Sequence, residues 1–397
     1  MGETERPLGS SESKELAGNR HEVKESRYWS SKSTKRLDDE KSCEKGQIRP
    51  LKVSSVKNKE GKPPPGLEWK SFDVENDEDL EILFQFLRRE YNATTDRQEA
   101  DRPSGSGEGG NEVTELAEQT SIFFSKEYIK WILSAPRSRP EFHLGLVTAN
   151  PLDSPGELVA FISTVPATMS IDGEHLESGE IGFLCIDRRY RSMRLTPVLS
   201  EEIIRRLIRN SYFQGIFQSK DVLYGRLTQV GCYSRPLLLP DGRSERSDLV
   251  RVNQSNIEKV RTFVNQEMRK YSVSKFFSPE DFKHNFLPRK DIVESFFMTR
   301  GSRVTDFCSF HLNKLEGTDK TVVCMTYALS MFDYTRLMRE SLAATSKFAV
   351  AMMCYGIGGV IDTLEKFEFK ECETMNFHLY NWKYPLTDPH DICYFIF

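Results

Sequence analysis

One order of secondary-structure signals occurs twice along this chain, and it limits the possible folds more than any other feature. Each copy reads as two helices, three strands and a further helix. The first copy is expected at 77–91, 125–133, 142–148, 158–165, 180–186 and from Pro197 onward. The second is expected from Ser255, from Ser278 and at 292–299, 304–311, 322–329 and 334–349. Two copies of one unit fit 397 residues, so we expect two related halves of mixed helix and strand.

The helix starts carry recognisable capping residues. Ser125 and Ser278 precede apolar helical spacing, and Ser278 is followed by Pro279. Ser255 and Glu258 have the spacing of a capping box, which predicts that this helix begins at Ser255.

A basic loop follows the apolar run 181–186. It holds four arginines, Arg188, Arg189, Arg191 and Arg194, and Thr196 with Pro197 suits the start of the next helix, with Thr196 as N-cap. Free N–H groups at a helix start and arginine side chains together bind phosphate or pyrophosphate. No glycine pattern of the P-loop or Rossmann kind is present, which leaves coenzyme A among the candidate ligands. The alternative is an ordinary solvated helix start.

The sequence ends on an apolar run, 391–397, which predicts a buried terminal strand. Burial would bring the α-carboxylate of Phe397 into the interior, where desolvation raises its pKa. A carboxylate in that state can act as a general base toward an ammonium substrate. The alternative is a strand that closes a sheet while its carboxylate reaches water.

Composition narrows the class of protein. The formal net charge of −4 gives no overall field for nucleic acid, and we expect no specific nucleic-acid partner. No apolar run is long enough to span a bilayer. The eight cysteines form no CxxC pair, which indicates a reduced, cytoplasmic protein without a bound metal.

Two segments are polar and poor in apolar anchors. Residues 1–66 are expected to be a mostly disordered tail that is basic between 20 and 62. Two interpretations of this tail remain open: it docks on an anionic surface, such as a ribosome or membrane, or it is a solvated linker. Tyr28 and Trp29 are aromatic exceptions within it. Residues 92–111 are expected to be an inserted loop or a lid.

These segments together resemble the glycylpeptide N-myristoyltransferases. The family's phosphate loop, FLC-x-x-K/R-K/R-x-RS-x-R-x-x-P, is matched from Phe183 to Pro197. Further matches, in family order, lie at 64–66 with Trp69, 158–167, 215–218, 304–310 and 378–383.

The resemblance implies an α+β fold of two GNAT-like halves with pseudo-twofold symmetry, here 67–235 and 236–397. It implies transfer of a myristoyl group from myristoyl-CoA, as substrate, to the N-terminal glycine amine of a protein or peptide. It implies no permanently bound cofactor, and we expect a monomer.

The resemblance also assigns roles to residues. The backbone N–H groups of Phe183 and Leu184 would form the oxyanion hole, and the Phe397 carboxylate would be the general base. Tyr91 and Tyr233 would contact the peptide. The CoA moiety would be held by Tyr28, Trp29, Arg188, Arg189, Arg191, Ser192, Met193, Arg194, Leu195 and Thr196.

The departures from the family pattern fall mostly on the peptide side. Gly182 stands where the family usually has Asn. The family's Tyr-Thr-Ala-Gly run has no clear equivalent in 219–224, and its Tyr-Trp-His-Arg segment shortens to 233–235. Its acidic loop after the Tyr91 position is replaced by 92–111, and its Asn-Ala-Leu-Asp segment by 355–359. A divergent transferase, an impaired paralogue that binds acyl-CoA or lipidated N-termini, and a GNAT-type acetyltransferase are the alternatives.

Overall fold

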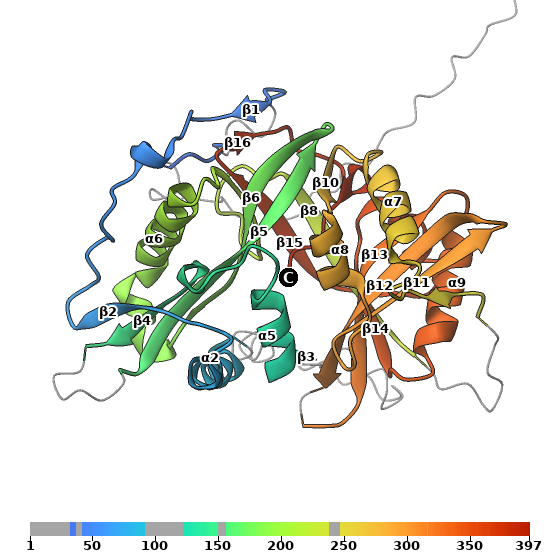
Figure 1. The fold of residues 1–397 in the computed structure, drawn as a ribbon, viewed down its shortest axis with the longest axis horizontal. Coiled ribbons are helices and arrows are strands. Elements are labelled where there is room, and N and C mark those ends of the chain that lie inside the picture. The colour runs from blue at the N-terminus through green and yellow to red at the C-terminus, as the bar shows by residue number, and fades with distance from the viewer. Residues whose placement is uncertain (1–31, 37–41, 92–121, 150–155, 238–246, 316) are drawn as a thin grey trace, which may run out of the picture.

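One 15-stranded sheet joins the two halves of the chain within the described residues (Figure 1). The computed structural model describes residues 32–36, 42–91, 122–149, 156–237, 247–315 and 317–397. Tyr28, Trp29 and the segment 92–111 lie outside them, so their predicted roles stay predictions.

The strands are β1 (Gly46–Gln47), β2 (Leu67–Ser71), β3 (Ile122–Phe123), β4 (His143–Thr148), β5 (Leu158–Ile171), β6 (Glu174–Ile186), β7 (Gln214–Ser219), β8 (Thr228–Pro236), β9 (Val250–Arg251), β10 (Val273–Phe276), β11 (Val293–Arg300), β12 (Arg303–Leu315), β13 (Thr321–Ser330), β14 (Ala351–Tyr355), β15 (Lys370–Tyr380), β16 (Trp382–Lys383) and β17 (Ile392–Cys393). The α-helices are α2 (Asp77–Glu90), α5 (Lys126–Leu133), α6 (Leu195–Arg209), α7 (Ile257–Met268), α8 (Pro279–Phe286), α9 (Tyr334–Thr345) and α10 (Ile361–Leu364). The 3-10 helices are η2 (Val53–Ser55), η4 (Pro140–Phe142), η5 (Arg188–Met193), η6 (Gly358–Val360) and η7 (Pro389–Asp391).

The repeated unit is present in the structure. In the first half, β4, β5 and β6 are antiparallel neighbours, and α6 then crosses over to β7, which lies parallel to β6. In the second half, β11, β12 and β13 are antiparallel neighbours, and α9 crosses over to β14, parallel to β13. A helix that joins parallel neighbours is the usual crossover connection.

The two halves exchange their last strands. β8, from the first half, pairs with β14 of the second, and β15, from the second half, pairs with β7 of the first. β8 and β15 also pair with each other, and β10 pairs with β5. Each half therefore completes the other's sheet, and residues 67–235 and 236–397 form one structural body.

Two of the predicted helix starts are wrong. The N-cap of α6 is Arg194, in the left-handed region at φ 53°, and Thr196 lies within the first turn. The N-cap of α7 is Asn256, whereas the N–H and Oγ of Ser255 donate to Asn253 Oδ1. Asn and Asp side chains compete with a neighbouring serine for the backbone donors of a turn, which displaces the expected capping box. The caps at Ser125 and Ser278 are confirmed.

The expectation of a disordered tail to residue 66 is wrong for 32–36 and 42–66. β1 pairs with β16, and the segment before β2 lies along α6 (Figure 1). Glu202 accepts a hydrogen bond from the Gly61 N–H, and Arg206 pairs with Glu60 at 2.8 Å. These charge-assisted contacts fix a polar segment that has few apolar anchors.

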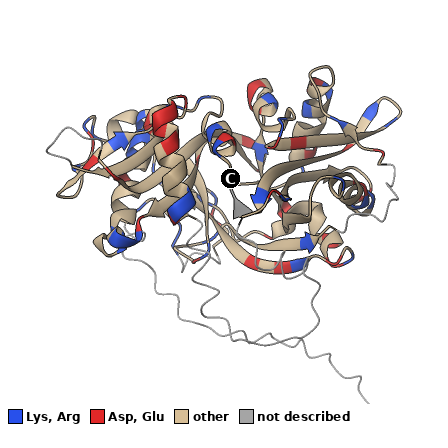
Figure 2. Ribbon diagram, turned by 90° about the horizontal axis from the view of Figure 1, so that it is seen from below, with Lys and Arg blue, Asp and Glu red and all other residues tan. Residues whose placement is uncertain are grey.

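The chain terminus lies in the middle of the molecule, between the two halves (Figures 1 and 2). The expected continuous terminal strand is wrong, because β17 covers only two residues, which pair in parallel with β10. Tyr394 and Ile396 beyond it are nevertheless buried. Apolar packing rather than a strand ladder therefore carries the end of the chain inward.

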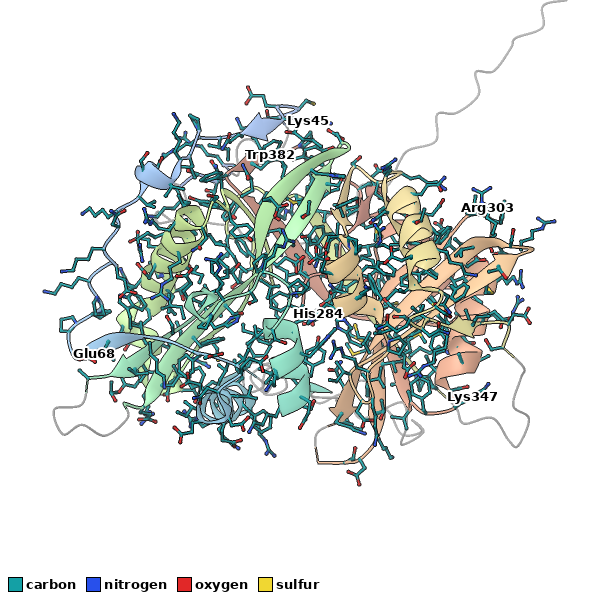
Figure 3. All side chains as sticks on the ribbon, viewed as in Figure 1. Lys45, Glu68, His284, Arg303, Lys347 and Trp382 are labelled. Carbon is teal, nitrogen blue, oxygen red and sulfur yellow. The ribbon has the colours of Figure 1, made fainter. Side chains whose placement is uncertain are left out.

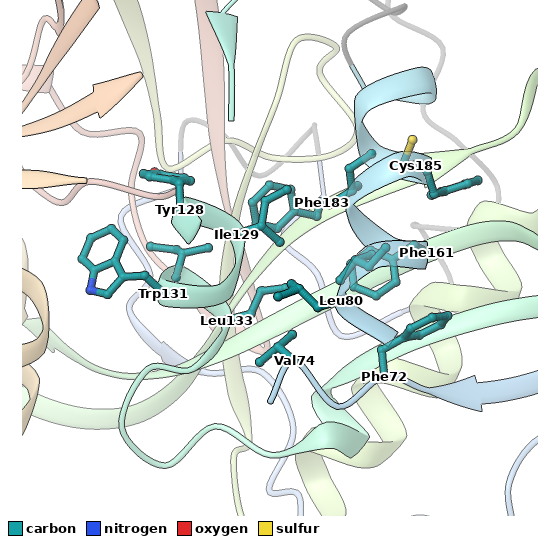
Figure 4. Close-up of a cluster of buried hydrophobic side chains, with 14 of the residues drawn as sticks. Phe72, Val74, Leu80, Tyr128, Ile129, Trp131, Leu133, Phe161, Phe183 and Cys185 are labelled. Carbon is teal, nitrogen blue, oxygen red and sulfur yellow. The ribbon is translucent and has the colours of Figure 1, made fainter. Parts of the chain in front are cut away.

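A core cluster of the first half supports this terminus (Figure 4). It includes Phe161, Trp131 and Phe183, and the rings of Tyr91 and Phe397 pack against it. Full burial of such a side chain contributes about 1.5–3 kcal/mol. Along the ribbon, Lys and Arg residues are interspersed with Asp and Glu residues in both halves (Figure 2).

Candidate active site

The central feature of the site is a gap between two neighbouring strands. β6 and β7 pair only between Ser178–Glu180 and Gln214–Ile216, and beyond that they diverge. The gap opens into a cavity of about 430 Å³, called here the donor slot. Its walls come from β6, β7 and α6 and include Ile181, Gly182, Phe183, Leu184, Thr196, Ser200, Ile203, Ile204, Phe217, Gln218 and Ser219. A mostly apolar wall with few polar groups suits a long apolar ligand.

A β-bulge lies at the wall of the donor slot. Phe183 and Leu184 together oppose the single residue Ile162 on β5. Phe183 has φ 50°, and the residue is 3% exposed. A left-handed backbone at a bulky residue costs about 1–2 kcal/mol, and such bulges are common next to active sites because they re-aim backbone groups.

Phe397 lies where three cavities meet. It lines the donor slot, a second cavity of about 180 Å³ called here the acceptor cavity, and a small one of about 20 Å³. Its ring centroid lies 5.4 Å from that of Phe183. A Cβ added at Gly182 would lie 2.7 Å from Phe397 Cε2. The glycine at this position, a departure from the family pattern, therefore makes room for the terminal ring.

The four loop arginines separate into two groups. Arg189 forms paired hydrogen bonds with Asp187, at 3.0 and 2.7 Å, and also contacts Glu157. The hydrogen bonds to Asp187 and Glu157 raise the pKa of Arg189, and Arg189 in turn helps to lower the pKa of Asp187. Arg191 Nε donates to the Ile186 carbonyl at 3.3 Å. These two side chains stabilise the loop itself.

Arg188 and Arg194 are exposed, and neither side chain has a partner among the described residues. The Arg188 N–H donates to Glu90, so only its side chain is available. Ser192 and Met193 are also exposed next to the start of α6, whereas Leu195 is fully buried. The free N–H groups of the first turn of α6 and two unpaired arginines thus remain for an anion.

The two predicted peptide-site tyrosines have different surroundings. Tyr91 lines both the donor slot and the acceptor cavity, and its ring lies 5.6 Å from Phe183. Burial raises its pKa to about 12, so its hydroxyl stays protonated. Tyr233 packs against a separate core cluster of the second half, and its neighbour Cys232 lines the acceptor cavity instead. The structure therefore brings Tyr91, but not Tyr233, to Phe397.

Three further residues belong to the site. Gln218 lines both the donor slot and the acceptor cavity, and its Nε2 donates to the Ile396 carbonyl at 3.5 Å. His311 and Asn313 line the acceptor cavity from β12. Gln218 belongs to a segment that matches the family. His311 and Asn313 could not be identified from the sequence, because polar residues on a strand indicate a functional site only when the residues that face them are known.

No group of three or more His, Cys, Asp or Glu side chains within the described ranges is arranged to hold a metal. No helix of this described part is long and apolar enough to cross a membrane.

Comparisons with known proteins agree on one family. The N-terminal domain of myristoyl-CoA:protein N-myristoyltransferase matches residues 110–230, and its C-terminal domain matches 238–391. A glycylpeptide N-tetradecanoyltransferase of Candida glabrata is 24% identical over 94% of this chain and 91% of its own length. That of Plasmodium falciparum is 24% identical over 92% of each chain. The match to the Saccharomyces cerevisiae enzyme, 26% identical, covers 73% of this chain and 65% of that protein.

A solved structure of Saccharomyces cerevisiae N-myristoyltransferase with bound myristoyl-CoA is similar in fold. It superposes with a TM-score of 0.77 at 22% identity and covers 92% of this chain and 94% of that one. The expected α+β fold of two GNAT-like halves is confirmed by this similarity and by the repeated strand order.

Proposed function

This chain belongs to the myristoyl-CoA:protein N-myristoyltransferase family, and we propose that it transfers a myristoyl group from myristoyl-CoA to the N-terminal glycine amine of a protein or peptide. The observation that carries the proposal is the position of Phe397, which lies where the donor slot meets the acceptor cavity. A transfer reaction needs such a junction, because both substrates have to reach one point.

The donor slot supplies the acyl side of the reaction. The apolar chain would lie between β6, β7 and α6, with the thioester at the bulge. The N–H groups of Phe183 and Leu184 would then stabilise the negative charge on the thioester oxygen in the transition state. The phosphates of CoA would lie at the start of α6, near Arg188 and Arg194 and the backbone of 192–196, with Arg189 and Arg191 holding the loop.

The chain's own terminus supplies the base. A free α-amine has a pKa of about 8 and is mostly protonated at neutral pH. The α-carboxylate of Phe397 would accept a proton from the glycine ammonium, and the neutral amine would attack the thioester carbonyl. The new C–N bond forms, the C–S bond breaks, and CoA leaves as its thiol after taking up a proton. The thioester is already activated, so positioning and charge stabilisation complete the reaction.

Five basic residues line a surface hollow beside β1 and β16, namely Lys32, Arg36, Lys45, Arg49 and Lys383. Lys45 and Trp382 mark this edge of the molecule in Figure 3. Lys32, Lys45 and Lys383 pair with Glu201, Asp172 and Glu44, which neutralises part of this charge. Docking of a cytoplasmic monomer on an anionic surface would therefore depend on Arg36, Arg49 and the basic residues of segment 20–62.

A direct assay tests the proposal. The purified chain is incubated with myristoyl-CoA and a panel of glycine-starting peptides, and acylated products are identified by mass. The same peptides with an acetylated N-terminus are the control and should give no product. Tight binding of myristoyl-CoA without any product would instead indicate a binding protein, the impaired-paralogue alternative.

A further inference from the structure

Gln218 has a buried oxygen atom at the junction of the donor slot and the acceptor cavity. Tyr91, Gln218 and Phe397 are the described residues that line both cavities. Of these three, only Gln218 has a buried side-chain atom, its Oε1, without a hydrogen-bond partner in the described part of the chain. Buried polar atoms nearly always have a partner, so an unpaired one at this junction indicates that its partner arrives with a substrate.

The nitrogen end of the Gln218 amide is held by the protein. Its Nε2 donates to the carbonyl of Ile396, the residue before Phe397, at 3.5 Å. Burial raises the pKa of Tyr355, and a side-chain hydrogen bond from Gln218 opposes part of this rise. A hydrogen bond that lowers the pKa of a tyrosine is donated to its oxygen, and Nε2 is the only donor of a glutamine side chain. The nitrogen therefore serves both neighbours, and Oε1 is the end that is left for a ligand.

The backbone of β7 fixes Gln218 beside the gap in the sheet. Gln218 lies two residues past Ile216, the last residue of β7 that pairs with β6, so the gap opens next to it. Along its other edge it stays paired with Phe377 of β15. A side chain on a strand that is held in this way is positioned more precisely than one on a loop.

The acceptor amine needs a group of this kind. A glycine ammonium carries three N–H groups, and acylation removes two of their protons. The carboxylate of Phe397 would accept the first and release it to solvent, and the departing thiolate would take up the second as the C–S bond breaks. The third proton stays on nitrogen as the N–H of the new amide. An amide oxygen accepts a hydrogen bond but takes no proton at neutral pH, so Gln218 Oε1 suits the N–H that is retained.

We propose that Gln218 is a further catalytic residue that binds the acceptor amine, and this inference rests on the proposed function. Its Oε1 accepts a hydrogen bond from the N–H that the product keeps, while the carboxylate of Phe397 takes a proton that is removed. The two contacts together turn the nitrogen lone pair toward the thioester carbonyl. The same oxygen excludes an N-methylated amine, because the methyl group would take the place of the retained N–H.

The test compares a glycine peptide with the same peptide starting in N-methylglycine. In the wild type, kcat/KM should be lower for the N-methylglycine peptide by about 10- to 150-fold, the range for a lost hydrogen bond to a charged group. Gln218→Met keeps the length of the side chain without its oxygen and should lower kcat/KM for the glycine peptide by about the same factor. In this variant the ratio between the two peptides should fall to within about threefold of 1, because the methyl group no longer displaces a hydrogen bond.

Two further variants keep the test decisive, and binding of myristoyl-CoA shows that each variant is folded. Gln218→Leu removes the oxygen with a different shape and should also lose the discrimination, even where Gln218→Met fails to fold. Asn376→Leu is the matched control. Asn376 is a buried amide of β15 whose Nδ2 donates to the Lys220 carbonyl at 2.7 Å and whose Oδ1 is unpaired in the described part of the chain. It lies outside the described walls of both cavities, so Asn376→Leu should keep the wild-type ratio.

Equal kcat/KM for the two peptides in the wild type overturns the inference and leaves the transfer reaction intact. A wild-type ratio that persists in a folded Gln218 variant also overturns it, as does loss of the ratio in folded Asn376→Leu. Acylation of no peptide at all overturns both the inference and the proposed function.

Discussion

Gly182 and Phe397 form a size-matched pair, and this match predicts a coupled loss and rescue of activity. The Cβ of Gly182→Ala would lie 2.7 Å from Phe397 Cε2 and 3.3 Å from its Cδ2 and Cζ. The ring cannot move freely, because it packs against Phe183 and the first-half core. Overpacking of this kind costs about 1–3 kcal/mol. Gly182 does not have a positive φ, so the effect is steric.

The displaced ring carries the proposed base with it. A misplacement of about 1 Å at a reacting group can lower a rate about 100-fold, so Gly182→Ala should lower kcat by that order. Phe397→Leu alone should lower stability, because it removes ring contacts. In the double variant the smaller leucine leaves space for the alanine methyl, and the two changes should differ from additivity by at least about 1 kcal/mol.

The assay measures kcat, KM for myristoyl-CoA and the free energy of unfolding for the wild type, both single variants and the double variant. Gly179→Ala is the matched control, because its Cβ would meet Leu207 and Thr164 rather than the terminus. It should lower stability without any rescue by Phe397→Leu. Strict additivity of Gly182→Ala and Phe397→Leu in both kcat and stability would refute the reasoning.

Three further predictions address the donor side and the pH response. Arg194→Gln should weaken CoA binding, measured by calorimetry. Arg189→Gln should chiefly lower thermal stability, because Arg189 already pairs with Asp187 at 2.7 Å. An equal loss of CoA affinity in both variants would contradict this division. Shortening the acyl chain by two carbons should weaken donor binding by about 1.6 kcal/mol, about 15-fold, at about 0.8 kcal/mol per buried CH₂; an unchanged Kd would exclude the apolar slot as its site. Burial lowers the pKa of His143 to about 4, below its value near 6.5 in the unfolded chain, so its contribution to stability is lost as pH falls from 6.5 to 4. Between pH 8 and pH 5, the free energy of unfolding measured in urea should fall by about 2 kcal/mol less in His143→Gln than in the wild type. An equal fall in both proteins would contradict this prediction.

The repeated unit was predictable from local patterns. The side of each helix or strand that packs against its neighbours must be apolar, and this requirement leaves a periodic pattern in the sequence. The helix start at Ser278 was predictable because an N-cap is a local hydrogen bond, here from the Asp281 N–H to Ser278 Oγ. The exchange of β8 and β15 was not predictable, since strand partners distant in sequence leave no local pattern. The fit of Gly182 to Phe397 was not predictable for the same physical reason. The Arg189–Asp187 pair is local, but which of the four loop arginines pairs there depends on the backbone of η5, which the sequence pattern does not show. A departure from the family pattern at Gly182 became meaningful only once the terminal ring was placed beside it.

The α-carboxylate of Phe397 is the group on which the proposed reaction depends. A semisynthetic protein with a C-terminal amide keeps the Phe397 ring and its packing but removes the base. Its kcat with a glycine peptide should fall by about 100- to 10,000-fold, the usual contribution of a general base, while the Kd for myristoyl-CoA stays within about twofold. Wild-type kcat in the amidated protein would contradict the assignment.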